Sequence, residues 1–417
     1  MQVKSILNRI QLQKGFVYEN VHWLNVDQTR ALGVEIRARK GSRPKCSVCE
    51  QAGPGYDVLP KRRFEFVPMW GIPVFFLYAM RRVACSTCGI KVERVPWAEG
   101  KSHLITTYKW FLAGWARRLS WKEVAEAFQT TWDNVFRSVK MAVKWGLQHR
   151  SLDNVTAIGI DELARRKGHK YLTMVYQIES SAKRLLWVGK DRTQKTLIQF
   201  FREFGQKNTA RLRFVVSDMW KPYLRIVTKK ADQSLQVIDR FHVMSHFGKA
   251  IDKIRASEAR ELKAKGEEPV LTGSRWCLLK RPKNLTAGQA VKLQELLHIN
   301  LKAVRAYILK EDFQKFWIYK KSAWAAKFLD AWCRRTMRSR LNPMKTVAKM
   351  LRSHRSYLLN WFACKDQVAT GAIEGFNNKA NVTTRKAFGF RSIDVQKVVL
   401  YQTLGDLQEP ALTHKFC

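Results

Sequence analysis

The sequence predicts a multidomain α/β protein, and three observations support this prediction. The hydrophobic pattern changes along the chain from strand-like to helical, then to alternating strands and helices, then to helical again. Two Cys-x-x-Cys pairs lie within the first strand-like zone. The chain has 417 residues, 46% of them hydrophobic, which is enough for roughly two to four folded domains.

The charge of the chain is strongly positive, with 76 Lys and Arg against 34 Asp and Glu and a net charge of +42. This balance excludes an ordinary acidic-to-neutral metabolic enzyme. It favours a polyanionic partner, because each phosphate neutralised by Lys or Arg releases bound counterions. The longest apolar stretch, 67–80, contains Pro and Gly and is too short to cross a bilayer of about 30 Å. The start lacks a secretory signal, so we expect a protein inside the cell with no membrane partner.

Residues 1–102 read as a zinc-binding, β-rich domain. Strand-like segments at 33–39, 63–69 and 74–80 are separated by Gly and Pro turns. Two thiolates three positions apart can share one face of a tetrahedral zinc ion, and two such pairs make a closed structural site. Alternatives are four unligated buried cysteines or a redox pair. The expected zinc ligands are Cys46, Cys49, Cys85 and Cys88.

Residues 103–150 turn helical and resemble a helix-turn-helix. Ser120 and Glu123 have the pattern of a capping box at the start of the second helix, and Thr131 can cap a third. That third helix offers three cations to DNA, although plain helical packing is an alternative that only the overall charge disfavours. These cations are Arg137, Lys140 and Lys144.

Residues 151–244 read as strands interspersed with helices. The expected order is three successive strands, a helix, a strand, a helix and a strand, which is the element order of a ribonuclease-H-like core. Residues 245–364 read as an all-helical insertion, in which Leu293 to Ile308 would lie on one long helix and most tryptophans would be core. Residues 365–417 then supply the last part of the core.

Carboxylates that end apolar strands are notable in so basic a chain. Asp161 and Asp218 end the first and fourth core strands, where the fold would place them side by side. Glu374 lies after the helical block, flanked by glycines and amides. Three such carboxylates can hold two divalent metal ions about 4 Å apart for an in-line phosphoryl displacement. Each alone could instead be a helix cap or a solvated group, as we expect for Asp153, and Glu162 should point to the opposite sheet face.

Four segments in this order resemble a known family: GIDE, VVSDMWKPY, IDRFHV and GAIEGFNNKANVTTRKAFGFRS. With the leading cysteine pairs, they are similar to DDE transposases of bacterial insertion sequences, in the zinc-ribbon group named insertion-sequence L-three. The resemblance implies that Asp161, Asp218 and Glu374 are catalytic and hold two Mg²⁺ (or Mn²⁺) ions, with one structural Zn²⁺ elsewhere. It also implies that Asp239 and His242 support the site without ligating metal; alternatively, Asp239 caps a helix and His242 merely packs. Further expected DNA contacts are Asn378, Arg385, Lys386 and Arg391.

The resemblance implies an enzyme that cuts the ends of its own insertion sequence and joins the 3′-hydroxyl ends to target DNA. Its partners would be double-stranded DNA, at terminal inverted repeats and at the target, and a second copy of the chain or more. It would act in the bacterial cytoplasm, associated with the nucleoid. Two alternatives are a zinc-ribbon and helix-turn-helix DNA-binding regulator without catalysis, and a ribonuclease-H-like nuclease without strand joining.

Overall fold

The computed structural model divides into two compact units. The first comprises residues 1–150 and 386–417, and the second comprises residues 151–385. Arg391, one of the residues expected at DNA, lies outside the residues that the structure describes. The described residues are 3–26, 28–166, 170–369, 371–387, 389–390 and 392–410.

A five-stranded sheet forms the first part of the first unit. Its order is β1-β2-β4-β3, with the short β5 paired to β4; β2 and β4 run parallel and the other pairs antiparallel. The three expected strands are confirmed as parts of β2, β3 and β4, whereas β1 and the helix α1 (Val3–Ile10) were not predicted. The strands are β1 (Phe16–Val26), β2 (Thr29–Ala38), β3 (Gly55–Met69), β4 (Ile72–Cys85) and β5 (Gly89–Val92).

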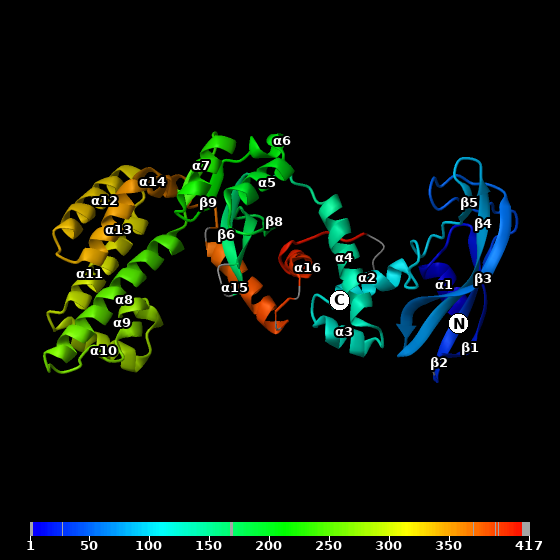
Figure 1. The fold of residues 1–417 in the computed structure, drawn as a ribbon, viewed down its shortest axis with the longest axis horizontal. Helices are drawn as coiled ribbons and strands as arrows, with labels where there is room; N and C mark the ends of the chain where they lie inside the picture. Colours follow the sequence, from blue (N-terminus) through cyan, green and yellow to red (C-terminus); the bar gives the residue numbers. More distant parts are fainter. Residues whose placement is uncertain are drawn as a thin grey trace. The chain divides into compact units, whose positions relative to one another are not determined.

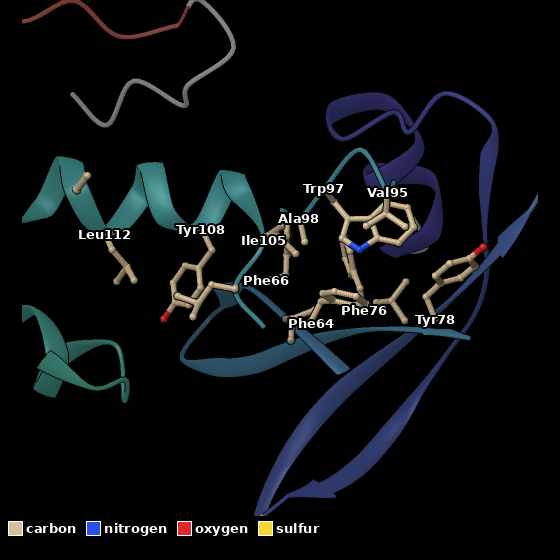
Figure 2. Close-up of a cluster of buried hydrophobic side chains, with 14 of the residues drawn as sticks. Phe64, Phe66, Phe76, Tyr78, Val95, Trp97, Ala98, Ile105, Tyr108 and Leu112 are labelled. Carbon is tan, nitrogen blue, oxygen red and sulfur yellow. The ribbon is translucent and has the colours of Figure 1, made fainter. Parts of the chain in front are cut away.

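The core of this unit is centred on Trp97, which is only 1% exposed. Its ring meets those of Phe16 and Tyr78 edge to face, at centroid distances of 4.8 and 5.3 Å. Such pairs contribute about 0.5–1.5 kcal/mol each beyond the area they bury. Figure 2 shows Tyr108 and Leu112 extending the same cluster onto the following helix. The sheet and the helices after it therefore share one hydrophobic core.

Two helices of this unit begin at the capping residues that the sequence predicts. The side chain of Ser120 accepts from the Glu123 amide at 3.2 Å, and the Glu123 carboxylate accepts from the Ser120 amide at 2.7 Å. Thr131 accepts from the Asn134 amide at 3.2 Å. Both predicted caps are confirmed. The helices are α2 (Thr106–Trp115), α3 (Trp121–Ala127) and α4 (Trp132–His149).

The last described segment also belongs to the first unit, through α16 (Ile393–Leu404) and the residues after it. Arg117 pairs with Glu409 at 2.9 Å. Gly146 on α4 leaves room for Leu407, because a Cβ at Gly146 would lie 2.7 Å from the Leu407 Cβ. Residues after 385 thus pack on α4, whereas the sequence pattern places all of 365–417 in the core.

The second unit is built on a mixed five-stranded sheet of order β10-β9-β6-β7-β8. β9 runs parallel to both β10 and β6, and β7 runs antiparallel to both β6 and β8. The expected sequence of strands and helices is confirmed. The strands are β6 (Ala157–Arg166), β7 (Lys170–Ile178), β8 (Lys183–Lys190), β9 (Phe214–Ser217) and β10 (Leu235–Ile238).

Helices cover both faces of this sheet, because β6 alternates its side chains between them. Ile158 and Ile160 pack against hydrophobic side chains of α5 (Gln194–Phe204) and α7 (Lys221–Lys230). The short helix α6 (Gln206–Thr209) lies between α5 and β9 in the chain. Gly159 points the other way. A Cβ there would lie 2.5 Å from the Cδ1 of Ile373, so glycine lets the helix carrying Ile373 lie close to the strand.

That helix is α15 (Gly371–Lys386), which carries Glu374. Phe376 stacks on Tyr176 of β7 at a centroid distance of 4.9 Å. Just before the helix, Ala369 N donates to the Ile178 carbonyl at 2.9 Å. The end of the helical insertion is thereby fixed to the sheet, and α15 is held against β6 and β7.

Helices between β10 and α15 form a bundle, seen beside the sheet in Figure 1. Trp317, Trp332 and Trp361 are buried in it, as expected for most of its tryptophans, while Trp276 and Trp324 are exposed. Within the described ranges, no helix has the length and apolar character needed to cross a membrane. The helices are α8 (Arg240–Ala264), α9 (Arg275–Leu279), η1 (Pro282–Asn284), α10 (Ala287–Leu297), α11 (Lys302–Phe313), η2 (Gln314–Ile318), α12 (Ser322–Met337), α13 (Asn342–Ser353) and α14 (Arg355–Cys364).

The expectation of one long helix from Leu293 to Ile308 is wrong. The chain leaves the helix after Leu297 and starts a new one at Lys302. Buried Glu258 on α8 accepts hydrogen bonds from the amides of Lys302 and Ala303, at 2.6 and 2.7 Å. A carboxylate at a helix start satisfies free amides and the positive end of the helix dipole, so α8 stabilises the break.

Candidate active site

Asp161 and Asp218 lie at the same level of the sheet. Ala157 pairs with Phe214 and Gly159 with Val216 in the parallel ladder of β6 and β9. Continued by two residues, this register brings Asp161 opposite Asp218. Neighbouring strands lie about 4.8 Å apart, so the backbones of the two aspartates are neighbours. Asp218 directly follows β9, but β6 continues to Arg166, so the prediction that Asp161 ends its strand is wrong.

Asp161 is buried, with three close polar neighbours. Its Oδ2 accepts from the side-chain amide of Asn377 on α15, and its Oδ1 lies 3.5 Å from Nε2 of His242 on α8. The amide of Glu162 donates to Oδ1 at 2.8 Å. Asp161 therefore joins β6 to the helices on either side of the insertion.

Asp218 is held by the turn that follows β9 and by an arginine. Its Oδ1 accepts from the Trp220 amide at 2.9 Å, and its Oδ2 accepts from Arg192 at 2.6 Å. The Arg192 guanidinium also lies 4.6 Å from the centre of the Trp220 ring. Sequence reasoning missed Arg192, since a lone cation in the turn between β8 and α5 has no recognisable pattern.

Glu162 points to the opposite sheet face from Asp161, as expected for the next residue of a continuing strand. Its Oε1 lies 2.8 Å from Nε of Arg192, an ion pair without the alignment of a hydrogen bond. Burial first, and then the charges of Asp218 and Asp161, raise the pKa of Glu162 to about 8 against the opposing effect of Arg192. Arg192 thus lies between two carboxylates.

Asp239 and His242 begin α8, directly after β10. Asp239 caps the helix by accepting from the Phe241 amide at 3.0 Å. Burial first, and then the charges of Asp161 and Glu374, raise the pKa of Asp239 to about 6. Burial lowers the pKa of His242, but contact with Asp161 and the charges of Asp239 and Asp218 raise it to about 9. The structure therefore has a helix cap at Asp239 and also a histidine facing Asp161.

Glu374 is exposed in the first turn of α15. It lies one helical turn before Asn377, so their side chains share one side of the helix. Its charge reaches Asp239 strongly enough to raise the pKa of that carboxyl. Three cationic or amide side chains expected at DNA are exposed further along the chain: Asn378, Arg385 and Lys386.

The four cysteines of the first unit form a cluster, and among the described residues no other group of three or more Cys, His, Asp or Glu side chains is close enough to share an ion. All four Sγ atoms lie within 4.8 Å of one another. Asp161, Asp218 and Glu374 do not form such a group: Asp161 contacts Asn377, and Asp218 contacts Arg192. The cysteine set is compatible with zinc and contains Cys46, Cys49, Cys85 and Cys88.

The two halves of the cysteine cluster have matching geometry. Backbone amides of Cys49 and Val48 point at the Sγ of Cys46 and lower its pKa. Amides of Cys88 and Thr87 do the same for Cys85, whose pKa falls to about 7. In each pair the backbone amides therefore favour the thiolate of one cysteine, and thiolates are the form that binds metal.

The cations of α4 form a solvent-exposed row. Lys140 and Lys144 follow Arg137 by three and seven positions, which places them along one side of the helix. Arg137 also forms an ion pair with Asp133 and borders a hollow of about 250 Å³. No carboxylate lines that hollow, whose residues are Lys101, Ser102, His103, Leu104, Lys109, Asn134, Arg137 and Ser138.

Residues 158–399 match a family described as transposase, of the ISL3 group of DDE enzymes. The chain belongs to this family. The transposase is 27% identical over 384 residues to the transposase for insertion sequence element IS1001 of Bordetella parapertussis, covering 91% of this chain and 92% of that protein. It is 29% identical over 385 residues to the transposase for insertion sequence element IS1557 of Mycobacterium tuberculosis, covering 86% and 85%.

The match includes Asp161 on β6, Asp218 directly after β9, and Glu374 on α15. The sequence prediction of a DNA transposase from a bacterial insertion-sequence family is confirmed. The transposase is accordingly an enzyme that acts on DNA.

Proposed function

We propose that the transposase cuts and joins DNA strands by metal-dependent phosphoryl transfer at Asp161, Asp218 and Glu374. The observation that carries this proposal is the parallel pairing of β6 with β9, whose register, continued by two residues, sets Asp161 opposite Asp218. The docking of α15 on the same strand supports it, because α15 carries Glu374. We also propose that the core is ribonuclease-H-like, since the observed strand order places its first and fourth strands side by side at the sheet centre.

The donor set fits a divalent cation such as Mg²⁺ or Mn²⁺, two per site. Carboxylate oxygens are the ligands that these hard cations prefer, and Asp161 and Asp218 would hold them at the sheet edge with Glu374 approaching from α15. Bound there, the ions would stabilise the attacking and leaving oxygens of an in-line displacement. For a cation to bind Asp218 Oδ2, the hydrogen bond from Arg192 to that oxygen must break. Arg192 would still have its contacts with the Trp220 ring and with Glu162.

The remaining side chains orient these carboxylates. Asn377 fixes one oxygen of Asp161 and leaves the other toward His242. His242 in turn has a raised pKa and is protonated at neutral pH, so it can balance the charge of the carboxylates around it. Asp239 holds the start of α8 and thereby the position of His242.

The first unit would recognise the DNA. We propose that Cys46, Cys49, Cys85 and Cys88 bind one structural Zn²⁺, and that α3 and α4 act as a helix-turn-helix. In this proposal the α4 row of Arg137, Lys140 and Lys144 contacts the terminal inverted repeats. Cutting two ends and joining them to target DNA would require a homodimer or a larger assembly.

The test is an assay of the full chain on duplex DNA carrying the element's ends, with Mg²⁺ and a 3′-hydroxyl acceptor. Asp161→Asn, Asp218→Asn and Glu374→Gln should each lower the cleavage rate by about 10²-fold or more, while end binding persists. Asp153→Asn is the matched control, since this exposed carboxylate precedes the same strand and pairs only at the surface with Arg211, at 2.8 Å.

Each outcome has a definite meaning. Wild-type cleavage by one of the three variants would remove that residue from the site. Cleavage without transfer to the acceptor, by the unaltered chain, would assign the protein a nuclease activity instead of strand joining. If Asp153→Asn lowered the cleavage rate as much as the three site variants do, the assay would be reporting overall charge balance and not metal binding.

A further inference from the structure

The end of the helical insertion carries an unusual concentration of positive charge. Residues 331–360 contain eight Lys and Arg and no Asp or Glu. They run from the second half of α12 through α13 into α14, and Figure 1 shows these three helices together. The sequence has no acidic residue between Asp330 and Asp366.

Only part of this charge is neutralised within the structure. Arg335 pairs with Asp312, and Arg355 pairs with Asp330 at 2.9 Å. The Arg355 hydrogen bond, and then the charges of Arg334 and Arg352, hold the pKa of Asp330 below its usual value. One carboxylate therefore faces three guanidinium groups. Five cations make no ion pair with any described residue: Arg334, Arg338, Arg340, Lys345 and Lys349.

Of the unpaired cations, Arg334 lies on α12, Lys345 and Lys349 lie on α13, and Arg338 and Arg340 lie in the connection between these helices. α13 buries Met344, Val347, Ala348 and Leu351, which leaves Lys349 and Arg352 exposed on the other side. α12 packs against α13 near Cys333, whose Sγ lies 3.8 Å from the Ala348 carbonyl oxygen. We name the surface shared by the two helices the α12–α13 basic face, made of Arg334, Arg338, Arg340, Lys345, Lys349 and Arg352.

The basic face contains a hollow. Its volume is about 340 Å³, and its lining is Ala331, Arg334, Arg335 and Arg338. These four residues are spaced by three, one and three positions, so they line up along one side of α12. They extend about 10 Å along the helix, the rise of about three base-pair steps of duplex DNA.

Helix stability does not account for this arrangement. Cations favour the carboxyl end of a helix, which explains Arg334 and Arg335 in the last turn of α12. They disfavour the amino end, where Arg355 of α14 is already neutralised by Asp330. Lys345 lies close to the start of α13, which has no acidic residue in its first turn. An anionic ligand would offset the cost of placing Lys345 there.

We propose that the α12–α13 basic face binds the sugar–phosphate backbone of duplex DNA. The established action of this family on DNA supplies the polyanion, and arginines in a row suit phosphate oxygens, which accept two hydrogen bonds from one guanidinium. The helical insertion then provides a DNA contact separate from both the carboxylates and the α4 row. This inference goes beyond the proposed catalytic function and does not depend on it.

The experiment compares two triple variants of the full chain. Arg334→Gln, Arg338→Gln and Lys349→Gln remove charge from the basic face. Lys253→Gln, Lys263→Gln and Lys283→Gln remove the same charge from exposed positions elsewhere in the insertion, where no ion pair with a described residue is lost. Both triples should keep the wild-type thermal melt, because all six side chains are at the surface.

Binding to duplex DNA is measured over a range of salt concentrations without divalent metal, so that the outcome is independent of the catalytic carboxylates. Each phosphate contact contributes about 0.9 to the slope of log K against log salt. The basic-face triple should lower that slope by about 2 to 3, and the control triple should leave it unchanged. A photo-crosslinker at position 338 should join the chain to DNA in the wild-type background.

Equal loss of slope in the two triples would mean that net charge alone matters and would overturn the proposal. So would an unchanged slope in the basic-face triple together with no crosslink. A basic-face triple that bound DNA normally but lost self-association in sedimentation would assign this face to a second copy of the chain and also overturn it.

Discussion

Asn377 bonds to Asp161, a residue 216 positions earlier in the chain. The carbonyl of the same side chain accepts from the Tyr176 hydroxyl at 2.7 Å. An ionised carboxylate can only accept, so the amide nitrogen of Asn377 must face Asp161 and its oxygen must face Tyr176. This pair of bonds sets both the rotation of α15 and the direction of the Asp161 carboxylate.

Replacing Asn377 tests the strength of that arrangement. Asn377→Asp places a second carboxylate against Asp161 and leaves a half-buried bond unmade, which should destabilise the second unit by about 1–3 kcal/mol. Asn378→Asp is the control, since this neighbour is exposed and should change stability by less than about 0.5 kcal/mol. Denaturant unfolding measures both, and equal stability of the two variants would show that the Asn377 bonds do not stabilise the fold.

His242 should act on the rate of cleavage and not on DNA binding. Its Nε2 lies 3.5 Å from Asp161 Oδ1, so His242→Ala removes a cation from beside that carboxylate. We expect a loss in cleavage rate of about 10–100-fold with unchanged end binding and thermal melting. His242→Gln, which carries an N–H donor at a similar reach, should recover part of the rate. Wild-type cleavage by the alanine variant would leave His242 only a packing role.

Zinc should be present in the purified chain at about one ion per molecule. Cys85→Ser should lose it and unfold the β-rich part of the first unit, because a structural site contributes its binding energy to folding. Cys277→Ser should keep it, since Cys277 is buried in the helical insertion, outside the cysteine cluster. Metal analysis of the two variants decides, and zinc retained in the Cys85 variant contradicts a four-thiolate site.

Glu258 should matter more to stability than its neighbour Glu261. Glu258→Ala leaves the amides of Lys302 and Ala303 without their acceptor, at a cost of about 1–3 kcal/mol. Glu261 on the same helix contacts the exposed end of Lys302 at 2.6 Å, and Glu261→Ala should have little effect. Urea unfolding of the two variants is the measurement. A smaller loss for Glu258 than for Glu261 would show that the break before α11 needs no cap from α8.

The α4 row should govern recognition of DNA ends. Replacing Arg137, Lys140 and Lys144 by Gln in the full chain should lower the salt slope of end binding by about 0.9 per lost phosphate contact. It should also reduce the preference for ends over random duplex DNA. Retained preference with weaker binding would mean that these cations hold the backbone while other residues read the bases.

The sequence was informative where local chemistry decides the structure. Ser120, Glu123 and Thr131 cap their helices as predicted, because a cap is made by residues that are close in the chain. The pattern also predicts that Asp161 and Asp218 belong to adjacent core strands, as the pairing of β6 with β9 indicates. It places Asp161 at the end of its strand, whereas pairing with β7 continues β6 to Arg166.

Other parts depend on contacts that no local pattern reveals. Glu258 interrupts a predicted helix from 44 residues away, and nothing near Leu297 signals it. Arg192 lies between Glu162 and Asp218 only because three separate segments meet there. Tertiary contacts determined these features, and local propensity is weak beside them.

The packing of residues after 385 on α4 has a consequence for synthesis. Gln402 donates to the Ala113 carbonyl across 289 positions, so a ribosome must complete the whole second unit before the first unit can close. A nascent chain would thus possess its cysteine cluster and α4 early but lack the partner for Gly146 until Leu407 emerges. The part of the molecule translated first is the part finished last.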